Sequence, residues 1–140
     1  MFVGILNGSF VFLADLVREL DLECEIEFVK LSSYRGKQTK PGRLRLRQSI
    51  GVSLAGRRVI VVEDVFDSGR SIAFVKNMIR RHSPHSIRVA TLLLKEKHIV
   101  REHPEYVGFR IPPGFVAGYG LDYDGKLRNR KSIYRLTRPE

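Results

Sequence analysis

A run of four β-branched residues, Val59 to Val62, is the feature that most limits how this chain folds. A continuous apolar run of this kind is typical of a strand that is buried on both faces of a parallel sheet. Parallel strands need crossover connections, and the chain supplies two helical patterns for them. Apolar residues recur at helical spacing from Phe10 to Leu20 and again from Ile72 to Ile79. The run therefore predicts an α/β fold with helices on both faces of the sheet.

Other apolar stretches complete the order of an α/β domain. Further strands are expected at 2–6, 25–31, 87–94, 106–109, 115–119 and 133–136, and Ser9 is expected to cap the first helix. The resulting alternation of strands and helices predicts a mostly parallel, twisted sheet. With 140 residues, 43% of them hydrophobic, we expect one domain spanning residues 1–140.

A long connection, residues 32–53, is rich in Gly, Ser, Thr and basic residues. A connection of this length within one domain is typical of a functional lid, so we expect a mobile loop there. Inside it, however, Arg43, Arg45 and Arg47 alternate with leucines, which is more typical of a β-ribbon with one basic face. Both interpretations stay open at this point.

The charge is large and uneven. The chain has 25 Lys and Arg against 15 Asp and Glu, a net charge of +10, and residues 30–62 contain nine bases and no acid. Such a block attracts phosphate-rich partners, either nucleic acid or a polyanionic small molecule.

No apolar stretch is long enough to span a bilayer, and the single cysteine, Cys24, agrees with a reducing compartment. We therefore expect a cytoplasmic protein without a membrane partner.

The residues that can do chemistry are concentrated after the β-branched run. Glu63 and Asp64 follow it directly, Asp67 comes three residues later, and Ser68 to Ser71 form a turn that opens a helix. Ligands of open α/β sheets bind at such strand ends, and the turn combines backbone N–H groups with hydroxyls, which suits a phosphate monoester. The adjacent acids suit vicinal hydroxyls or Mg²⁺, and Asp67 is a candidate proton acceptor.

The segment from Glu63 to Ser71 resembles the signature with which type I phosphoribosyltransferases bind phosphoribosyl pyrophosphate (PRPP). The resemblance covers nearly the whole chain and is specific to the hypoxanthine (6-oxopurine) phosphoribosyltransferases. It is carried further by Leu6–Leu16, Leu31–Tyr34, Lys95, Phe115–Tyr123 and Arg128–Asn129. It implies the type I phosphoribosyltransferase fold, with a small C-terminal segment over the base. It also implies a purine salvage enzyme that transfers the phosphoribosyl group of PRPP to N9 of hypoxanthine, and of guanine.

The resemblance implies roles at the PRPP end of the site. Glu63 and Asp64 would contact the ribose hydroxyls directly or through Mg²⁺, and Asp122 would meet a second metal ion beside the pyrophosphate. Arg128 would neutralise the leaving group, and Gly8 would let the backbone approach it closely. The residues implied for PRPP and its phosphates are Asn7, Gly8, Glu63, Asp64, Asp67, Ser68, Gly69, Arg70, Ser71 and Arg128, and those for metal are Glu63, Asp64 and Asp122. Many family members have lysine where this chain has Asn7, but a backbone contact there would retain activity.

The resemblance also implies how the base is held. Lys95 would donate to O6, which selects a 6-oxopurine and refuses adenine, and Asp67 would face N7 as the acid/base group. Phe115 would stack on the base, and the backbone of Val116 would read its Watson–Crick edge. Ser33 and Tyr34 would belong to a loop that closes over the reacting centre and excludes water.

Several alternatives stay open from the residues alone. Lys97 lies close to Lys95 in sequence, and an isolated Phe115 is more often a core residue than a stacking platform. Family members usually have a few dozen residues before the first strand, where this chain begins, and they usually form homodimers or homotetramers. The competing function is a regulator that binds RNA through its basic segments. We favour the enzyme, without a nucleic-acid partner, because RNA binding gives no reason for the acids and the sequence has no series of stacking aromatic residues.

Overall fold

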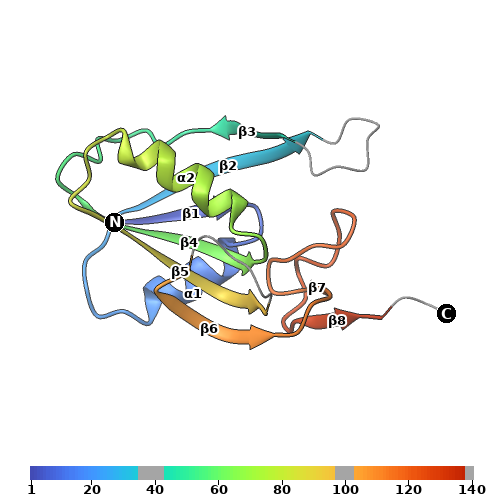
Figure 1. The fold of residues 1–140 in the computed structure, drawn as a ribbon. Coiled ribbons are helices and arrows are strands. Elements are labelled where there is room, and N and C mark those ends of the chain that lie inside the picture. Colours follow the sequence, from blue (N-terminus) through green and yellow to red (C-terminus); the bar gives the residue numbers. More distant parts are fainter. Residues whose placement is uncertain (35–42, 97–102, 138–140) are drawn as a thin grey trace.

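A computed structural model describes residues 1–34, 43–96 and 103–137. Its elements are β1 (Phe2–Leu6), α1 (Phe10–Arg18), β2 (Ile26–Tyr34), β3 (Arg43–Gln48), β4 (Arg58–Phe66), α2 (Arg70–Arg80), β5 (Ser86–Lys95), β6 (Tyr106–Ile111), β7 (Phe115–Ala117) and β8 (Tyr134–Leu136). Six strands form one sheet in the order β3-β2-β1-β4-β5-β6, and β7 pairs with β8 in a second, small sheet (Figure 1). Strands β2, β1, β4, β5 and β6 run parallel, whereas β3 is antiparallel to β2. The predicted mostly parallel α/β fold is confirmed.

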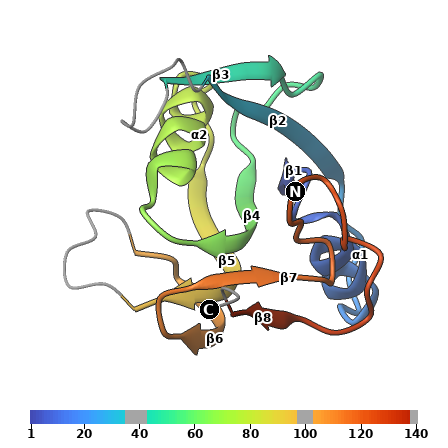
Figure 2. The ribbon, with the colours of Figure 1, turned by 90° about the vertical axis from the view of Figure 1, so that its right-hand side faces the viewer.

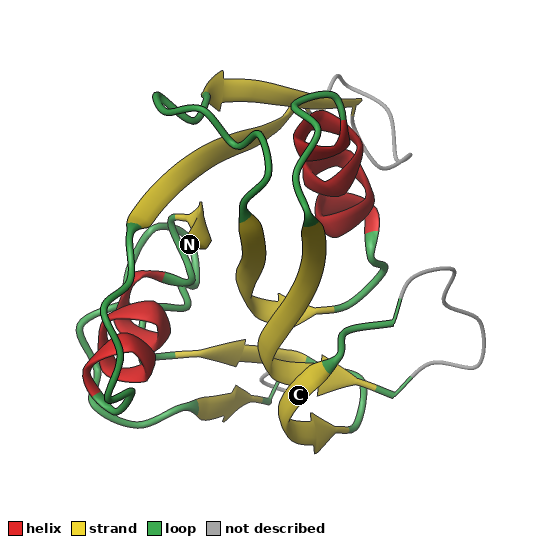
Figure 3. Ribbon diagram, turned by 90° about the vertical axis from the view of Figure 1, so that its left-hand side faces the viewer, coloured by secondary structure: helices red, strands yellow, loops and turns green. Residues whose placement is uncertain are grey.

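Strand β4 lies in the middle of the sheet, and helices cover both of its faces. Val59 and Val61 belong to the core beneath α2, and Val62, with half-buried Ile60 beside it, belongs to the core beneath α1. Figures 2 and 3 show the two helices on opposite sides of the sheet. The prediction that the β-branched run is buried on both faces is therefore confirmed, because its side chains alternate between two cores.

The connection predicted over 32–53 contains parts of two strands. Residues 32–34 continue β2, and 43–48 form β3, which pairs antiparallel with it. The interpretation as a β-ribbon is therefore confirmed for residues 32–34 and 43–48, and a loop covering the whole span is wrong. Positions 35–42 lie outside the described residues.

The prediction that Ser9 caps the first helix is wrong. The Ser9 side chain makes no cap hydrogen bond, and its hydroxyl instead donates to the Ile5 carbonyl at 2.7 Å. The hydroxyl thereby links the start of α1 back to the end of β1.

The segment after β6 closes the fold at the ends of the strands. Leu121 packs with Leu92 and Leu93 of β5, and Ile133 lies against the same cluster.

In the part of the chain that the structure describes, no helix is both long and apolar enough to cross a membrane.

Candidate active site

Four segments meet at the edge where the parallel strands end, which faces the viewer in Figure 2. They are the turn after β1, the turn between β4 and α2, the end of β5, and the segment between β7 and β8. Contacts between residues distant in sequence join them, as between Lys95 and Asp67 or between Gly120 and Gly8. Open α/β sheets bind their ligands at this edge, so it is the candidate active site.

The turn from Asp67 to Gly69 leads directly into α2. Gly69 has φ 71° and ψ 2°, a left-handed conformation that glycine adopts without strain, and the helix begins at Arg70. The Gly69 carbonyl accepts the Ala73 N–H at 2.8 Å as the first helical bond. The N–H groups of the first turn have no partner within the helix and carry its positive dipole end. The turn therefore suits an anionic group such as a phosphate.

Glu63 is buried on the α2 face of β4 and accepts a hydrogen bond from the Ser71 side chain. Burial raises the pKa of Glu63 well above its ordinary value, and the charges of Asp64 and Asp67 act in the same direction. Strand β4 continues to Phe66, so both acids lie within its C-terminal part. Because successive side chains of a strand alternate, Glu63 and Asp64 leave opposite faces of β4.

Asp64 lies against the turn that follows β1. A Cβ atom on Gly8 would lie 1.7 Å from Asp64 Oδ2, so glycine is required for this approach. A Cβ atom on Gly120 would likewise lie 2.5 Å from the Gly8 carbonyl oxygen. Burial raises the pKa of Asp64, while hydrogen bonds from backbone N–H groups and the charge of Arg128 oppose that rise. Two glycines therefore allow three segments of the site to come together.

Arg128 ties the C-terminal segment to the acids. Its Nη2 lies 2.8 Å from Asp122 Oδ1, and its Nη1 donates to the Gly120 carbonyl at 2.8 Å. Asp122 Oδ2 accepts the Gly125 N–H at 2.8 Å. The charge of Asp122 raises the pKa of Asp64, whereas the charge of Arg128 lowers it. The carboxylates of Asp64 and Asp122 and the guanidinium of Arg128 thus form one cluster of interacting charges beside the turn at Gly8.

A second group lies at the end of β5. Lys95 Nζ is 3.1 Å from Asp67 Oδ2 and 5.8 Å from the centroid of the Phe115 ring. Phe115 is 64% exposed, which excludes the alternative that it is a core residue. Lys97 lies outside the described residues. An ammonium, a carboxylate and an open aromatic face together suit a flat, polar ring.

The other residues predicted for the site lie in strands, in the turns that follow strands, or at the start of α2. Val116 is half-buried in β7, opposite Arg135 of β8. Ser33 and Tyr34 are the last residues of β2, and their predicted role in loop closure stays a prediction. Asn7 is exposed in the turn after β1, following a cis peptide bond from Leu6. Ser68 lies in the turn before α2, Arg70 is the first residue of that helix, and both are exposed.

The structure adds a contact to which the sequence assigns no role. Tyr119 Oη donates to Asp15 Oδ2 of α1 at 2.5 Å and so links the C-terminal segment to the first helix. Burial, with the hydrogen bond to Asp15, raises the pKa of Tyr119 to about 12, and this bond is the main cause that lowers the pKa of Asp15. The only local signal is that Tyr119 lies between two glycines, Gly118 and Gly120, which have φ 98° and 95°.

The carboxylates of the site differ in how well they suit Mg²⁺. In the described ranges, no three His, Cys, Asp or Glu side chains form a metal-binding group. Asp64 and Asp122 interact on one side of β4, whereas Glu63 is bound to Ser71 on the other. Mg²⁺ often uses one or two carboxylates and takes its other oxygens from substrate phosphates. Asp64 and Asp122 therefore fit Mg²⁺ together with a phosphate ligand, and Glu63 does not fit as a direct ligand.

Comparison with known proteins gives consistent matches. Residues 1–124 match the phosphoribosyl transferase domain family. The hypoxanthine phosphoribosyltransferase of Haemophilus influenzae is 41% identical over 139 residues, which are 99% of this chain and 78% of that protein. Among solved structures, a hypoxanthine-guanine phosphoribosyltransferase from Bacillus anthracis superposes with a TM-score of 0.89 at 40% identity, covering 97% of this chain and 81% of that one. A Trypanosoma cruzi hypoxanthine phosphoribosyltransferase in complex with its product IMP gives a TM-score of 0.88 at 34% identity, covering 98% and 71%.

The link between Tyr119 and Asp15 leads to a titration prediction. Tyr119→Phe is expected to raise the pKa of Asp15 toward its ordinary value of 3.8, because the tyrosine hydroxyl is the main group that lowers it. An NMR titration of the Asp15 carboxyl in both proteins measures the change. Tyr123→Phe, at an exposed tyrosine, is the matched control. An Asp15 pKa that is equal in wild type and Tyr119→Phe would contradict the contact.

The burial of Glu63 leads to a prediction about stability and pH. Its pKa is higher in the folded than in the unfolded chain, so the folded state binds the extra proton and loses stability as the pH rises above the ordinary value of 4.5. Glu63→Gln removes that loss. Its melting temperature relative to wild type should therefore increase from about pH 5 to about pH 8. A difference that is constant over this range in thermal unfolding would argue against the raised pKa.

Proposed function

Because the chain belongs to the phosphoribosyl transferase family, we propose that its candidate site catalyses the reaction of its hypoxanthine-specific relatives. The enzyme transfers the phosphoribosyl group of PRPP to N9 of hypoxanthine, and of guanine, and releases pyrophosphate. The products are IMP and GMP, so the activity belongs to purine salvage. The observation that carries this choice of base is the Lys95–Asp67 pair beside the exposed ring of Phe115.

The pair matches one edge of a 6-oxopurine. O6 and N7 lie next to each other on that edge, and the nitrogen and oxygen of Lys95 and Asp67 are 3.1 Å apart. Lys95 has only donors and so satisfies O6, while the carboxylate of Asp67 accepts the proton of N7. Phe115 supplies the stacking face, and the backbone of Val116 is proposed to read the opposite edge. Adenine presents an amino group at position 6, and its donors would meet the ammonium group of Lys95.

PRPP is proposed to occupy the rest of the strand edge. The turn from Ser68 to Ser71 would receive the 5-phosphate, and the acids of β4 would accept hydrogen bonds from the ribose hydroxyls. The turn at Asn7 and Gly8 and the guanidinium of Arg128 would face the pyrophosphate. Mg²⁺, held by Asp64 and Asp122 together with the phosphates, would neutralise charge on the leaving group.

The reaction then needs one displacement and one proton transfer. The bond from N9 of the base to the anomeric carbon forms, and the bond from that carbon to the pyrophosphate oxygen breaks. The proton on N7 passes to Asp67, which removes the positive charge that the base would otherwise gain. Arg128 stabilises the negative charge that develops on the pyrophosphate.

The cellular location and the assembly of the enzyme also belong to this proposal. We place the enzyme in the cytoplasm, where its single free cysteine, Cys24, would stay reduced. A homodimer or homotetramer would cover exposed apolar side chains such as Phe109, which is 63% exposed. Closure of the segment at Ser33 and Tyr34 over bound PRPP also belongs to this proposal.

Base selection tests the proposal. With PRPP and Mg²⁺, we expect turnover of hypoxanthine and guanine, and a kcat/KM for adenine lower by about 10⁴-fold. Lys95→Gln should reduce turnover of hypoxanthine and narrow the gap to adenine, because a glutamine carbonyl accepts hydrogen bonds from an amino group. A spectrophotometric assay with each base measures these ratios. Equal use of adenine by the wild type would exclude the proposed role of Lys95.

Asp67 is tested by removal of its charge alone. Asp67→Asn should lower kcat by about 10² to 10⁴-fold, the usual contribution of a general acid or base. Asp124→Asn makes the same chemical change at an exposed acid outside the proposed site and should leave kcat unchanged. Undiminished kcat in Asp67→Asn would remove this residue from the proton transfer.

A further inference from the structure

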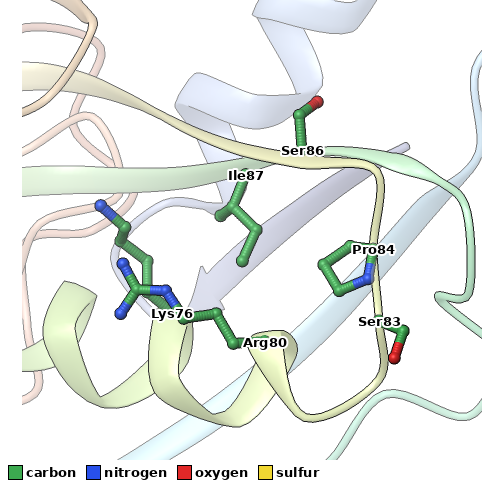
Figure 4. Close-up of a pocket in the computed structure, with 6 residues that line it drawn as sticks. All are labelled: Lys76, Arg80, Ser83, Pro84, Ser86 and Ile87. Carbon is green, nitrogen blue, oxygen red and sulfur yellow. The ribbon is translucent and has the colours of Figure 1, made fainter.

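The outer side of α2 carries a second cluster of polar and charged side chains, separate from the Lys95–Asp67 pair. A hollow of about 370 Å³ separates α2 from the ribbon strand β3. A neighbouring hollow of about 300 Å³ lies between α2 and the turn that leads into β5 (Figure 4). The first is lined by Arg43, Leu44, Arg70, Ala73, Phe74 and Asn77, and the second by Lys76, Arg80, Ser83, Pro84, Ser86 and Ile87.

The charges around the two hollows have one sign. Their lining includes the four cations Arg43, Arg70, Lys76 and Arg80, and no acid. Neither α2 nor β3 contains an acidic residue. In Figure 4 the ammonium of Lys76 and the guanidinium of Arg80 extend on the same side of α2. The face therefore attracts a partner that carries several negative charges along its length.

A hydrogen bond links the linings of the two hollows. Arg80 Nη1 donates to Asn77 Oδ1 at 2.9 Å, and these residues line different hollows. The bond holds the guanidinium in place without neutralising it. The cations are thus spread along the 11 residues of α2, about 16 Å of helix.

The lining between the cations is apolar at one end and rich in hydroxyls at the other. Leu44, Ala73 and Phe74 border the first hollow, and Ser83 and Ser86 border the second. Proteins that bind single strands combine cations for the phosphates with aromatic or guanidinium surfaces for the bases. The sequence lacks a run of aromatic residues, but Phe74, which packs in part against the core, lines the first hollow together with Arg43 and Arg70. We propose that this face, β3 with the outer side of α2, binds single-stranded RNA in addition to the enzymatic reaction.

A second copy of the chain is a less suitable occupant. A twofold interface sets the same patch of two subunits against each other, so Arg43, Lys76 and Arg80 would meet like charges. PRPP is too small to contact both hollows together with the strand edge, since only Arg70 borders both the phosphate turn and this face.

The test compares two variants with the same net charge. Lys76→Gln/Arg80→Gln removes two cations from this face, and Arg110→Gln/Lys126→Gln removes two exposed cations elsewhere. Binding of a labelled single-stranded RNA of mixed sequence is followed by fluorescence anisotropy over a salt series, with and without saturating PRPP. Turnover of hypoxanthine, which neither pair is expected to change, reports that both variants are folded.

For four phosphate contacts, wild-type affinity should fall about 50-fold between about 50 and about 200 mM salt, and that of Lys76→Gln/Arg80→Gln only about sevenfold. The control pair should keep the wild-type slope, and PRPP should not displace the RNA. The proposal would be overturned if the wild type did not bind the RNA, or if both double variants lost the same affinity. It would also be overturned if PRPP displaced the RNA, or if duplex RNA bound more tightly. So would a dimer that sedimentation detects in the wild type and the first pair abolishes.

Discussion

The alternation of side chains along β4 is the constraint on which the site depends. Because helices cover both faces of this strand, its valines alternate between two cores, and the same alternation continues into the acids. Glu63 is directed to α2 and bonds Ser71, while Asp64 is directed to the Gly8 turn. One strand therefore serves both the turn before α2, proposed to bind the 5-phosphate, and the turn after β1, proposed to face the pyrophosphate. A shift of the strand by one residue would exchange the positions of the two acids.

Long-range contacts divide the site into two ends with different chemistry. At one end, Lys95 and Asp67 form an ion pair beside an open aromatic ring, which suits the polar edge of a purine. At the other, the charges of Arg128 and Asp122 act on the half-buried carboxylate of Asp64, an arrangement that suits phosphates and a cation. The proposed base recognition and charge neutralisation are thus assigned to separate groups of side chains.

Charge is also distributed unevenly along the chain. Residues 1–29, which contain α1, have six acids and one base, whereas residues 30–62 have nine bases and no acid. In the fold, the second segment supplies β3, next to the basic outer side of α2. The excess of positive charge is therefore not confined to the strand edge where an anionic substrate would lie, and the proposed RNA surface accounts for its position.

The sequence by itself determined the order of strands and helices, the burial of β4 and the candidate residues, because these follow from local periodicity and from motifs. The sequence did not determine how far the ribbon of β2 and β3 extends, or which group the Ser9 hydroxyl binds. Each depends on which backbone groups lie nearby in the fold. Only the tertiary structure decided that Phe115 is an open platform and that Tyr119 bonds Asp15 across 104 positions. Such contacts join segments far apart in the chain, and no local pattern encodes which side chains will meet.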